Sequence, residues 1–142
     1  MGDSSIWIAD SSARILPGAA AGNARTLKVS GARGQVVSFQ VGMRPGRVVR
    51  KVEATLGGEM KKCATVRLAG LVPLRHHTTS TPAEMLEGDA PGFVPDPLVG
   101  VEGPLDAQVS RAIWVSLRLQ AVNWSGRVLQ TEKESEFVCV CV

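Results

Sequence analysis

The chain has 142 residues, of which 44% are hydrophobic and 20% are charged, and this size and composition fit one globular domain with a substantial core. The formal net charge is only +3 and the longest basic run is Lys61-Lys62, so a nucleic-acid partner that binds a clustered basic patch is not expected. The sequence has no apolar run long enough to cross a bilayer and no signal-peptide pattern at its start, so a membrane partner is not expected either.

Short β patterns recur along the chain between turn signals. Expected strands cover residues 6–8, 13–16, 26–29, 35–43, 48–56, 65–74, 113–119, 128–129 and 137–142. Many short strands without a long helix predict an all-β fold, an antiparallel β-sandwich of the immunoglobulin-like or jelly-roll-like kind. We expect residues 1–142 to form one domain, excised or truncated from the N-terminal part of a longer protein.

One long Pro-rich loop is expected from residue 75 to residue 110. It holds five of the eight prolines, namely Pro82, Pro91, Pro95, Pro97 and Pro104. Within it, only residues 82–87 favour a helical turn, because a proline is well placed in a first helical turn. A loop of this length inside a compact domain is usually functional or packed as an interface.

The alternation of apolar residues predicts which side chains fill the core, because one face of each strand in a sandwich is buried. The expected core residues are Val37, Phe39, Val66, Leu68, Val115 and Leu117. Trp114 lies on the opposite face of its strand and is expected to point outward. Either the Pro-rich loop covers it, with Asp96 accepting turn hydrogen bonds between two prolines, or another domain docks there.

No catalytic residue, metal site or cofactor is expected. Nothing in the spacing marks a catalytic pair among the carboxylates of the loop region, which are Glu84, Glu87, Asp89, Asp96, Glu102 and Asp106. His76 and His77 are neighbours on an extended segment and point in opposite directions, so they do not share a site. The cysteines are odd in number and lack metal-ligand spacing, so buried thiols are expected at Cys63, Cys139 and Cys141.

Five short motifs follow one another in order along most of the chain. They are Ala32-Arg33-Gly34-Gln35 with Ser38-Phe39-Gln40, Val66-Arg67-Leu68 with Val72-Pro73-Leu74, Pro91-Gly92-Phe93-Val94-Pro95-Asp96-Pro97-Leu98, Ile113-Trp114-Val115, and Trp124-Ser125-Gly126-Arg127-Val128. Together they resemble the N-terminal domain found in glycoside hydrolase family 123 and its uncharacterised relatives. Gln35 stands where that domain commonly has Glu, and Trp124 where it has Tyr.

The resemblance implies a non-catalytic β-sandwich that packs against a following catalytic (β/α) barrel. It implies chemistry of the β-N-acetylgalactosaminidase type in that barrel, with an adjacent Asp-Glu pair, and an extracellular or periplasmic location. This chain contains no Asp-Glu or Glu-Asp dipeptide, so we expect an accessory domain without activity of its own.

Two alternatives remain, a stand-alone carbohydrate-binding module and a structural or interaction domain. A sugar-binding module needs exposed aromatic side chains. The candidate interface or ligand-facing residues are the three tryptophans Trp114, Trp7 and Trp124, together with Asp96 of the Pro-rich loop.

Overall fold

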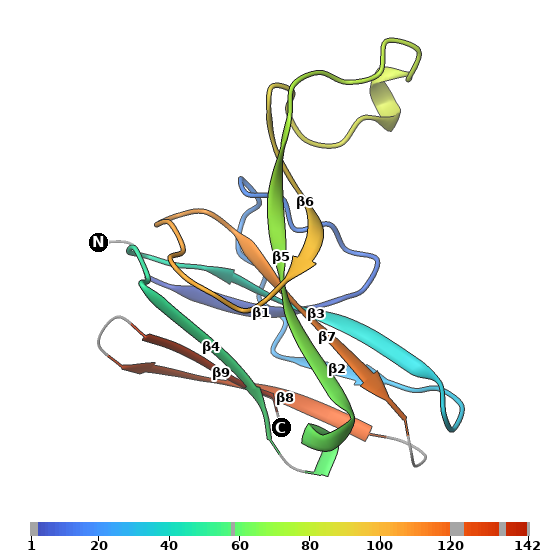
Figure 1. Ribbon diagram of the computed structural model, residues 1–142, viewed down its shortest axis with the longest axis vertical. Coiled ribbons are helices and arrows are strands. Elements are labelled where there is room, and N and C mark those ends of the chain that lie inside the picture. The colour runs from blue at the N-terminus through green and yellow to red at the C-terminus, as the bar shows by residue number, and fades with distance from the viewer. Residues whose placement is uncertain (1–2, 58, 120–123, 134–135, 142) are drawn as a thin grey trace.

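The structure is a computed structural model that describes residues 3–57, 59–119, 124–133 and 136–141, with side chains described for residues 3–57 and 61–119 (Figure 1). The described chain is all-β, and its helical elements are two short 3-10 helices. In chain order the elements are β1 (Ser5–Asp10), β2 (Thr26–Val29), β3 (Val36–Arg44), β4 (Lys51–Leu56), η1 (Glu59–Cys63), β5 (Ala64–Leu74), η2 (Ala83–Met85), β6 (Gly92–Val99), β7 (Arg111–Arg118), β8 (Trp124–Lys133) and β9 (Glu136–Cys141).

The strands form two sheets. A five-stranded sheet has the order β1-β3-β7-β5-β6, and a four-stranded sheet has the order β2-β8-β9-β4. All neighbours in the five-stranded sheet are antiparallel, as expected. The pair β4 and β9 is parallel, which differs from the expectation. A long connection separates these two strands, so no tight hairpin imposes the antiparallel direction on them.

One face of the five-stranded sheet carries the main hydrophobic core. Alternate residues of β3 and β7 are buried there, including Phe39 and Val115 at 1% exposure each. Val52 of β4 belongs to the same cluster and Leu27 of β2 packs against it, so both sheets contribute to this core. Four of the six expected core residues, Phe39, Leu68, Val115 and Leu117, are confirmed as buried members of this cluster. The other two, Val37 and Val66, are only partly buried and pack against it.

The Pro-rich region is not one long loop. Residues 92–99 form β6, which pairs with β5 at the edge of the five-stranded sheet. Proline was the reason to expect a loop, but an edge strand accepts proline because its outer backbone groups need no ladder partner. The expected helical turn is confirmed as η2, which directly follows Pro82.

The β5–β6 hairpin forms an arm, defined here as residues 70–99. Figure 1 shows this hairpin extending away from the other strands, with the connection between β5 and β6 at its far end. Gly70 permits a close approach inside the arm, since a Cβ there would lie 2.9 Å from the ring of Pro97. The register of the two strands also shifts between Ala69 and Leu71, an irregularity typical of sheet edges.

The segment between β1 and β2, residues 11–25, crosses the second face of the five-stranded sheet and is called the strap below. Backbone and side-chain hydrogen bonds hold it there. The amide of Ser110 donates to the carbonyl of Pro17 at 2.8 Å, and the Arg44 guanidinium donates to the carbonyl of Ala19 at 3.0 Å. The prediction of a strand at residues 13–16 is wrong, because these residues belong to the strap and form no strand. Ile15 is nevertheless buried, as its apolar side chain predicts.

Candidate functional site

The second face of the five-stranded sheet brings together two of the candidate residues, Trp114 and Asp96. Both line a cavity of about 300 Å³, called the Trp114 cavity here. Its base is formed by Gln40 on β3, Trp114 on β7 and Ala69 on β5, and Gln40 and Trp114 are direct cross-strand partners. Residues 95, 96 and 98 of β6 close one side, and residues 11–15 of the strap close another.

Trp114 points away from the main core, as its place in the alternation predicts. Its neighbours Ile113 and Val115 are each 1% exposed in the core, whereas Trp114 is half-buried and lines the cavity. The indole Nε1 donates to the Ser116 hydroxyl oxygen at 3.2 Å, and this hydroxyl also lies 2.9 Å from that of Ser38. These contacts hold the indole in one orientation, so the strap and β6 border a fixed aromatic surface.

Asp96 does not have the structural role expected from its place between two prolines. It lies in strand β6 rather than in a turn, and its side chain is exposed. Among the described residues its carboxylate has no hydrogen-bond or ion-pair partner. The carboxylate is therefore available at the rim of the Trp114 cavity.

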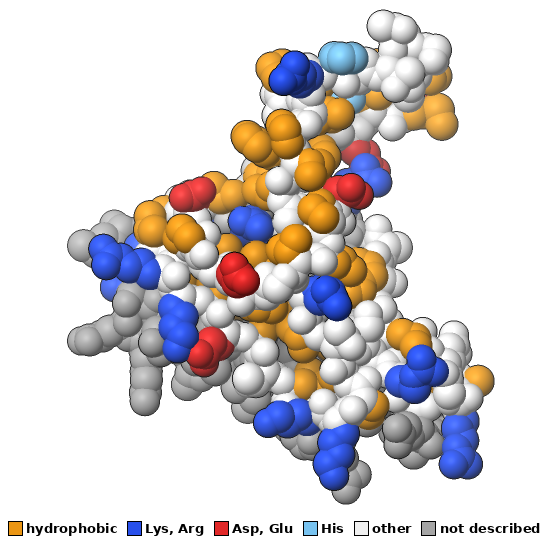
Figure 2. Space-filling view, in the orientation of Figure 1, with side chains coloured by type: hydrophobic (Ala, Val, Ile, Leu, Met, Phe, Trp, Pro, Cys, Tyr) orange, Lys and Arg blue, Asp and Glu red, His pale blue; other side chains and the backbone are white. Residues whose placement is uncertain are grey.

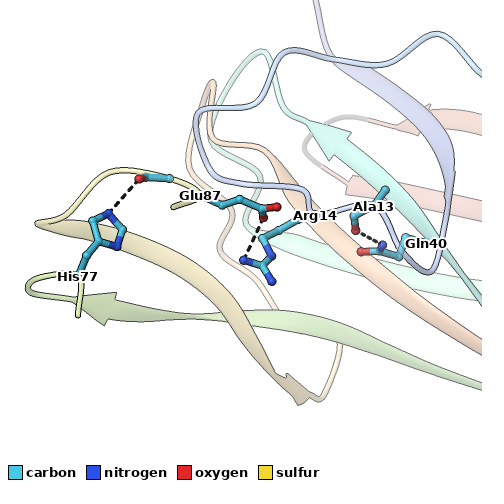
Figure 3. Close-up of polar contacts among 6 residues, drawn as sticks. Ala13, Arg14, Gln40, His77 and Glu87 are labelled. Atoms are coloured by element: carbon cyan, nitrogen blue, oxygen red, sulfur yellow. Dashed lines mark hydrogen bonds and ion pairs between the residues drawn. The ribbon is translucent and has the colours of Figure 1, made fainter. Parts of the chain in front are cut away.

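Gln40 is the most buried polar residue of the site, with 4% of its surface exposed. Its side-chain nitrogen donates to the backbone carbonyl of Asp10 at 3.0 Å. The same nitrogen donates to the backbone carbonyl of Ala13 at 2.6 Å (Figure 3). Both amide protons are thereby used, which fixes the amide plane. Within the described chain the amide oxygen accepts no hydrogen bond, and Gln40 lines the Trp114 cavity. The alternation along β3 places Gln40 on the face opposite to Phe39, but no local sequence signal predicts the strap that orients its amide.

The start of the strap is fixed by Asp10. Its Oδ1 accepts a hydrogen bond from the Ser12 backbone amide at 2.7 Å and another from the Ser12 hydroxyl. These bonds, the hydroxyl first, hold the pKa of the Asp10 carboxyl below its ordinary value. This is the local turn typical of Asp, and it directs the chain back across Gln40.

A second hollow adjoins the Trp114 cavity, and Arg14 lines both. It has a volume of about 470 Å³, lies between the strap and the arm, and is called the Phe93 cleft. Arg14 forms an ion pair with Glu87 of the arm at 3.0 Å, as Figure 3 shows. Both side chains are 59% exposed, so this pair adds little stability, but it joins the strap to the arm.

The other two aromatic candidates have different outcomes. Trp7 is only 5% exposed, so it offers little surface to a ligand. Its ring lies so close to Gly42 and Gly22 that a Cβ on either would overlap it. Trp124 begins β8, and its side chain lies outside the described residues, as do those of Cys139 and Cys141.

The remaining polar candidates lie apart from the cavity. A ring nitrogen of His77 lies 3.2 Å from the carbonyl oxygen of Gly88 within the arm, and His76 is exposed. Over the residues that the structure describes, no three His, Cys, Asp or Glu side chains are grouped to hold a metal ion. No helix in the described ranges has the length and apolar character that a membrane crossing requires.

No protein-family model matches this sequence, and no curated protein matches it.

Proposed function

We propose that the chain is a non-catalytic accessory domain that docks to a folded partner through its arm. The partner that the sequence resemblance implies is the catalytic (β/α) barrel of the same parent protein, a β-N-acetylgalactosaminidase-type glycoside hydrolase. The observation that carries the docking proposal is the exposure of large apolar side chains along the arm.

Six large hydrophobic side chains are exposed in the described part of the chain, and four of them lie on the arm. These are Met85 at 71%, Phe93 at 58%, Leu98 at 42% and Val99 at 42%. Figure 2 shows hydrophobic side chains following the arm along most of its visible length. Single exposed apolar residues are normal, but several on one projecting hairpin are typical of a protein interface.

The energetics favour a protein partner for this surface. Burying a Phe side chain contributes about 1.5–3 kcal/mol relative to leaving it in water. Arg14 and Asp89 line the Phe93 cleft and Glu87 is paired with Arg14, which gives the arm the polar rim that interfaces usually have. A partner with an apolar ridge and a polar border would complement it.

For the fold, we propose that the two sheets pack face to face as a β-sandwich of the immunoglobulin-like or jelly-roll-like kind. The main core supports this arrangement, because Val52 of the four-stranded sheet and Val115 of the five-stranded sheet belong to one buried cluster. Strands β2 and β4 of the four-stranded sheet both present apolar residues to this cluster, and apolar surfaces of a sheet are stable only when covered.

The test begins with the parent coding sequence, in which a barrel with an adjacent Asp-Glu pair is expected. The chain is then mixed with the separately expressed barrel, and the affinity is measured by calorimetry. Phe93→Ser is expected to weaken binding about tenfold or more, since losing one buried Phe contact corresponds to at least that factor. Val48→Ser is the matched control, because Val48 is 52% exposed and lies outside the arm.

Two results would contradict the proposal. Equal effects of Phe93→Ser and Val48→Ser would remove the arm from the interface. Hydrolysis of an aryl N-acetylgalactosaminide by the isolated chain, abolished by Asp96→Asn or Glu87→Gln, would show that the chain has its own active site.

A further inference from the structure

The Trp114 cavity contains an acceptor that the fold orients but does not use. Gln40 is 4% exposed, and its amide nitrogen is held by the carbonyls of Asp10 and Ala13. Its oxygen accepts no hydrogen bond from any described residue. The Gln40 side chain lines the cavity. Among the described residues, Arg111 Nε is the one buried side-chain polar atom without a hydrogen-bond partner, so the Gln40 oxygen keeps contact with solvent and is open to a donor in the cavity. The cavity therefore favours a molecule that carries hydrogen-bond donors.

The rest of the lining divides into an apolar part and a polar part. Trp114, Ala69, Pro95 and Leu98 provide aromatic and aliphatic surface. A ligand with one apolar face can pack on this part while its edges reach the polar groups. This combination excludes a small inorganic ion, which has no apolar face.

The charged groups favour a neutral ligand that both donates and accepts. Asp96 can only accept when ionised, and so can the Gln40 oxygen, whereas Arg14 only donates. The ion pair of Arg14 with Glu87 involves one guanidinium nitrogen, which leaves other N–H donors. An organic ammonium would suit Asp96 and the indole but would be repelled by Arg14. A hydroxyl group both donates and accepts, so hydroxyl groups can bond to the acceptors Asp96 and Gln40 and to the donor Arg14.

The geometry points to a sugar residue, and we propose that the Trp114 cavity binds a single pyranose ring. One face of the ring packs on the Trp114 indole, and ring hydroxyls donate to the Gln40 oxygen and the Asp96 carboxylate and accept from Arg14. The volume of about 300 Å³ is at the lower end of ligand cavities, which suits one ring rather than an oligosaccharide. Leu98 lines this cavity and is also one of the exposed apolar side chains of the arm, but the test below uses the chain without its partner, so its outcome does not depend on docking.

The test titrates the full chain, labelled with ¹⁵N, with methyl glycosides of common hexoses and N-acetylhexosamines, and follows the Trp114 indole N–H signal by NMR. A Kd of about 1 mM is expected for one open, shallow subsite. Asp96→Ala and Trp114→Ala are each expected to raise Kd about tenfold, and Trp114→Phe is expected to restore part of the affinity. Val48→Ala is the control, because Val48 is exposed and lines neither the Trp114 cavity nor the Phe93 cleft, and it is expected to bind like the wild type.

Asp96→Ala keeps the test decisive if Trp114→Ala fails to fold, because the Asp96 side chain is exposed and has no partner among the described residues. Oligosaccharides that end in the preferred ring show whether the natural ligand is a glycan terminus or a free sugar. A site for a glycan terminus binds these oligosaccharides at least as tightly as the methyl glycoside. The proposal is overturned if no glycoside shifts the Trp114 signal, if Asp96→Ala binds like the wild type, or if butylammonium binds and the glycosides do not.

Discussion

Gly42 is the position where one added methyl group tests the packing of the second sheet face most directly. Gly42 lies on β3 opposite Trp7 of β1, and a Cβ there would lie 2.2 Å from Trp7 Cε2 and 2.4 Å from Cζ2. Carbon atoms in contact are about 3.5–4.0 Å apart, so the indole must move in a Gly42→Ala variant. Gly22 lies against the other part of the ring and restricts that movement.

The expected cost follows from two opposing effects. Overpacking a well-filled site costs about 1–3 kcal/mol, whereas replacing Gly by Ala inside a strand contributes about 0.5–1 kcal/mol through the lower entropy of the unfolded chain. Gly42→Ala is therefore expected to lower the free energy of unfolding by up to about 2.5 kcal/mol, because the steric overlap outweighs the entropic gain. In a Trp7→Ala background the overlap is gone, and the same substitution is expected to be neutral or stabilising by up to about 1 kcal/mol.

Urea unfolding followed by far-ultraviolet circular dichroism measures all four proteins of this cycle without depending on tryptophan emission. Trp7→Ala alone is expected to cost about 3–5 kcal/mol, and Trp7→Val serves in its place if the alanine variant does not fold. Gly18→Ala is the control, because no atom lies within 4 Å of its added Cβ. If Gly42→Ala is equally destabilising with and without Trp7, the indole does not lie over β3 and the reasoning fails.

Two further expectations concern the core and the strap. Phe39 is 1% exposed and Phe93 is 58% exposed, so Phe39→Ala is expected to lower the unfolding free energy by about 3–5 kcal/mol and Phe93→Ala by less than about 0.5, as urea titration measures. Ser12 hydrogen bonds hold the pKa of Asp10 below its ordinary value of 3.8, so the unfolded chain takes up the proton first as the pH falls. The stability difference between the wild type and Asp10→Ala is therefore complete above that value and is lost below it. Urea midpoints measured from neutral to acidic pH check this, and a difference that grows on acidification would refute it.

The strands that the sequence predicts well are those with one fully buried face. β3, β5 and β7 alternate apolar and polar side chains over most of their length, because residues such as Phe39 and Val115 enter the core while Gln40 and Trp114 face the other way. Their boundaries agree with the expected ranges within a few residues. The outward direction of Trp114 follows from the same alternation.

Other features depend on contacts that no local pattern encodes. β6 contains Pro95 and Pro97, and prolines in a sequence predict a loop. A strand accepts them here because β6 lies at the edge of the sheet. The burial of Trp7 depends on the strap supplying Gly22, which is far from Gly42 in the sequence. The short β pattern at residues 13–16 predicts a strand, but the carbonyl of Ala13 instead accepts a hydrogen bond from the Gln40 side chain.

The candidate site combines features that local alternation predicts with features that depend on distant contacts. The alternation of β7 predicts that Trp114 points outward, and the sequence places Asp96 between two prolines, but neither pattern predicts that the two side chains lie at one site. Their meeting in one cavity requires the order β7-β5-β6, in which β5 separates the two strands that carry them. Gln40 becomes a candidate only when the carbonyls of Asp10 and Ala13 are seen to orient its amide.

The strand order also affects how the chain acquires its fold. β3 lies between β1 and β7 in the sheet. The residues of β7 that pair with β3 are far away in the sequence, as the 78-residue separation of Ser38 and Ser116 shows. During synthesis on the ribosome, β3 is therefore complete long before the strand that covers its second edge emerges. Sheets dominated by such distant pairings fold slowly, about milliseconds to seconds, and their unpaired edges attract other chains meanwhile. Yield in a heterologous host is accordingly expected to depend on temperature and on chaperones that hold nascent strands apart.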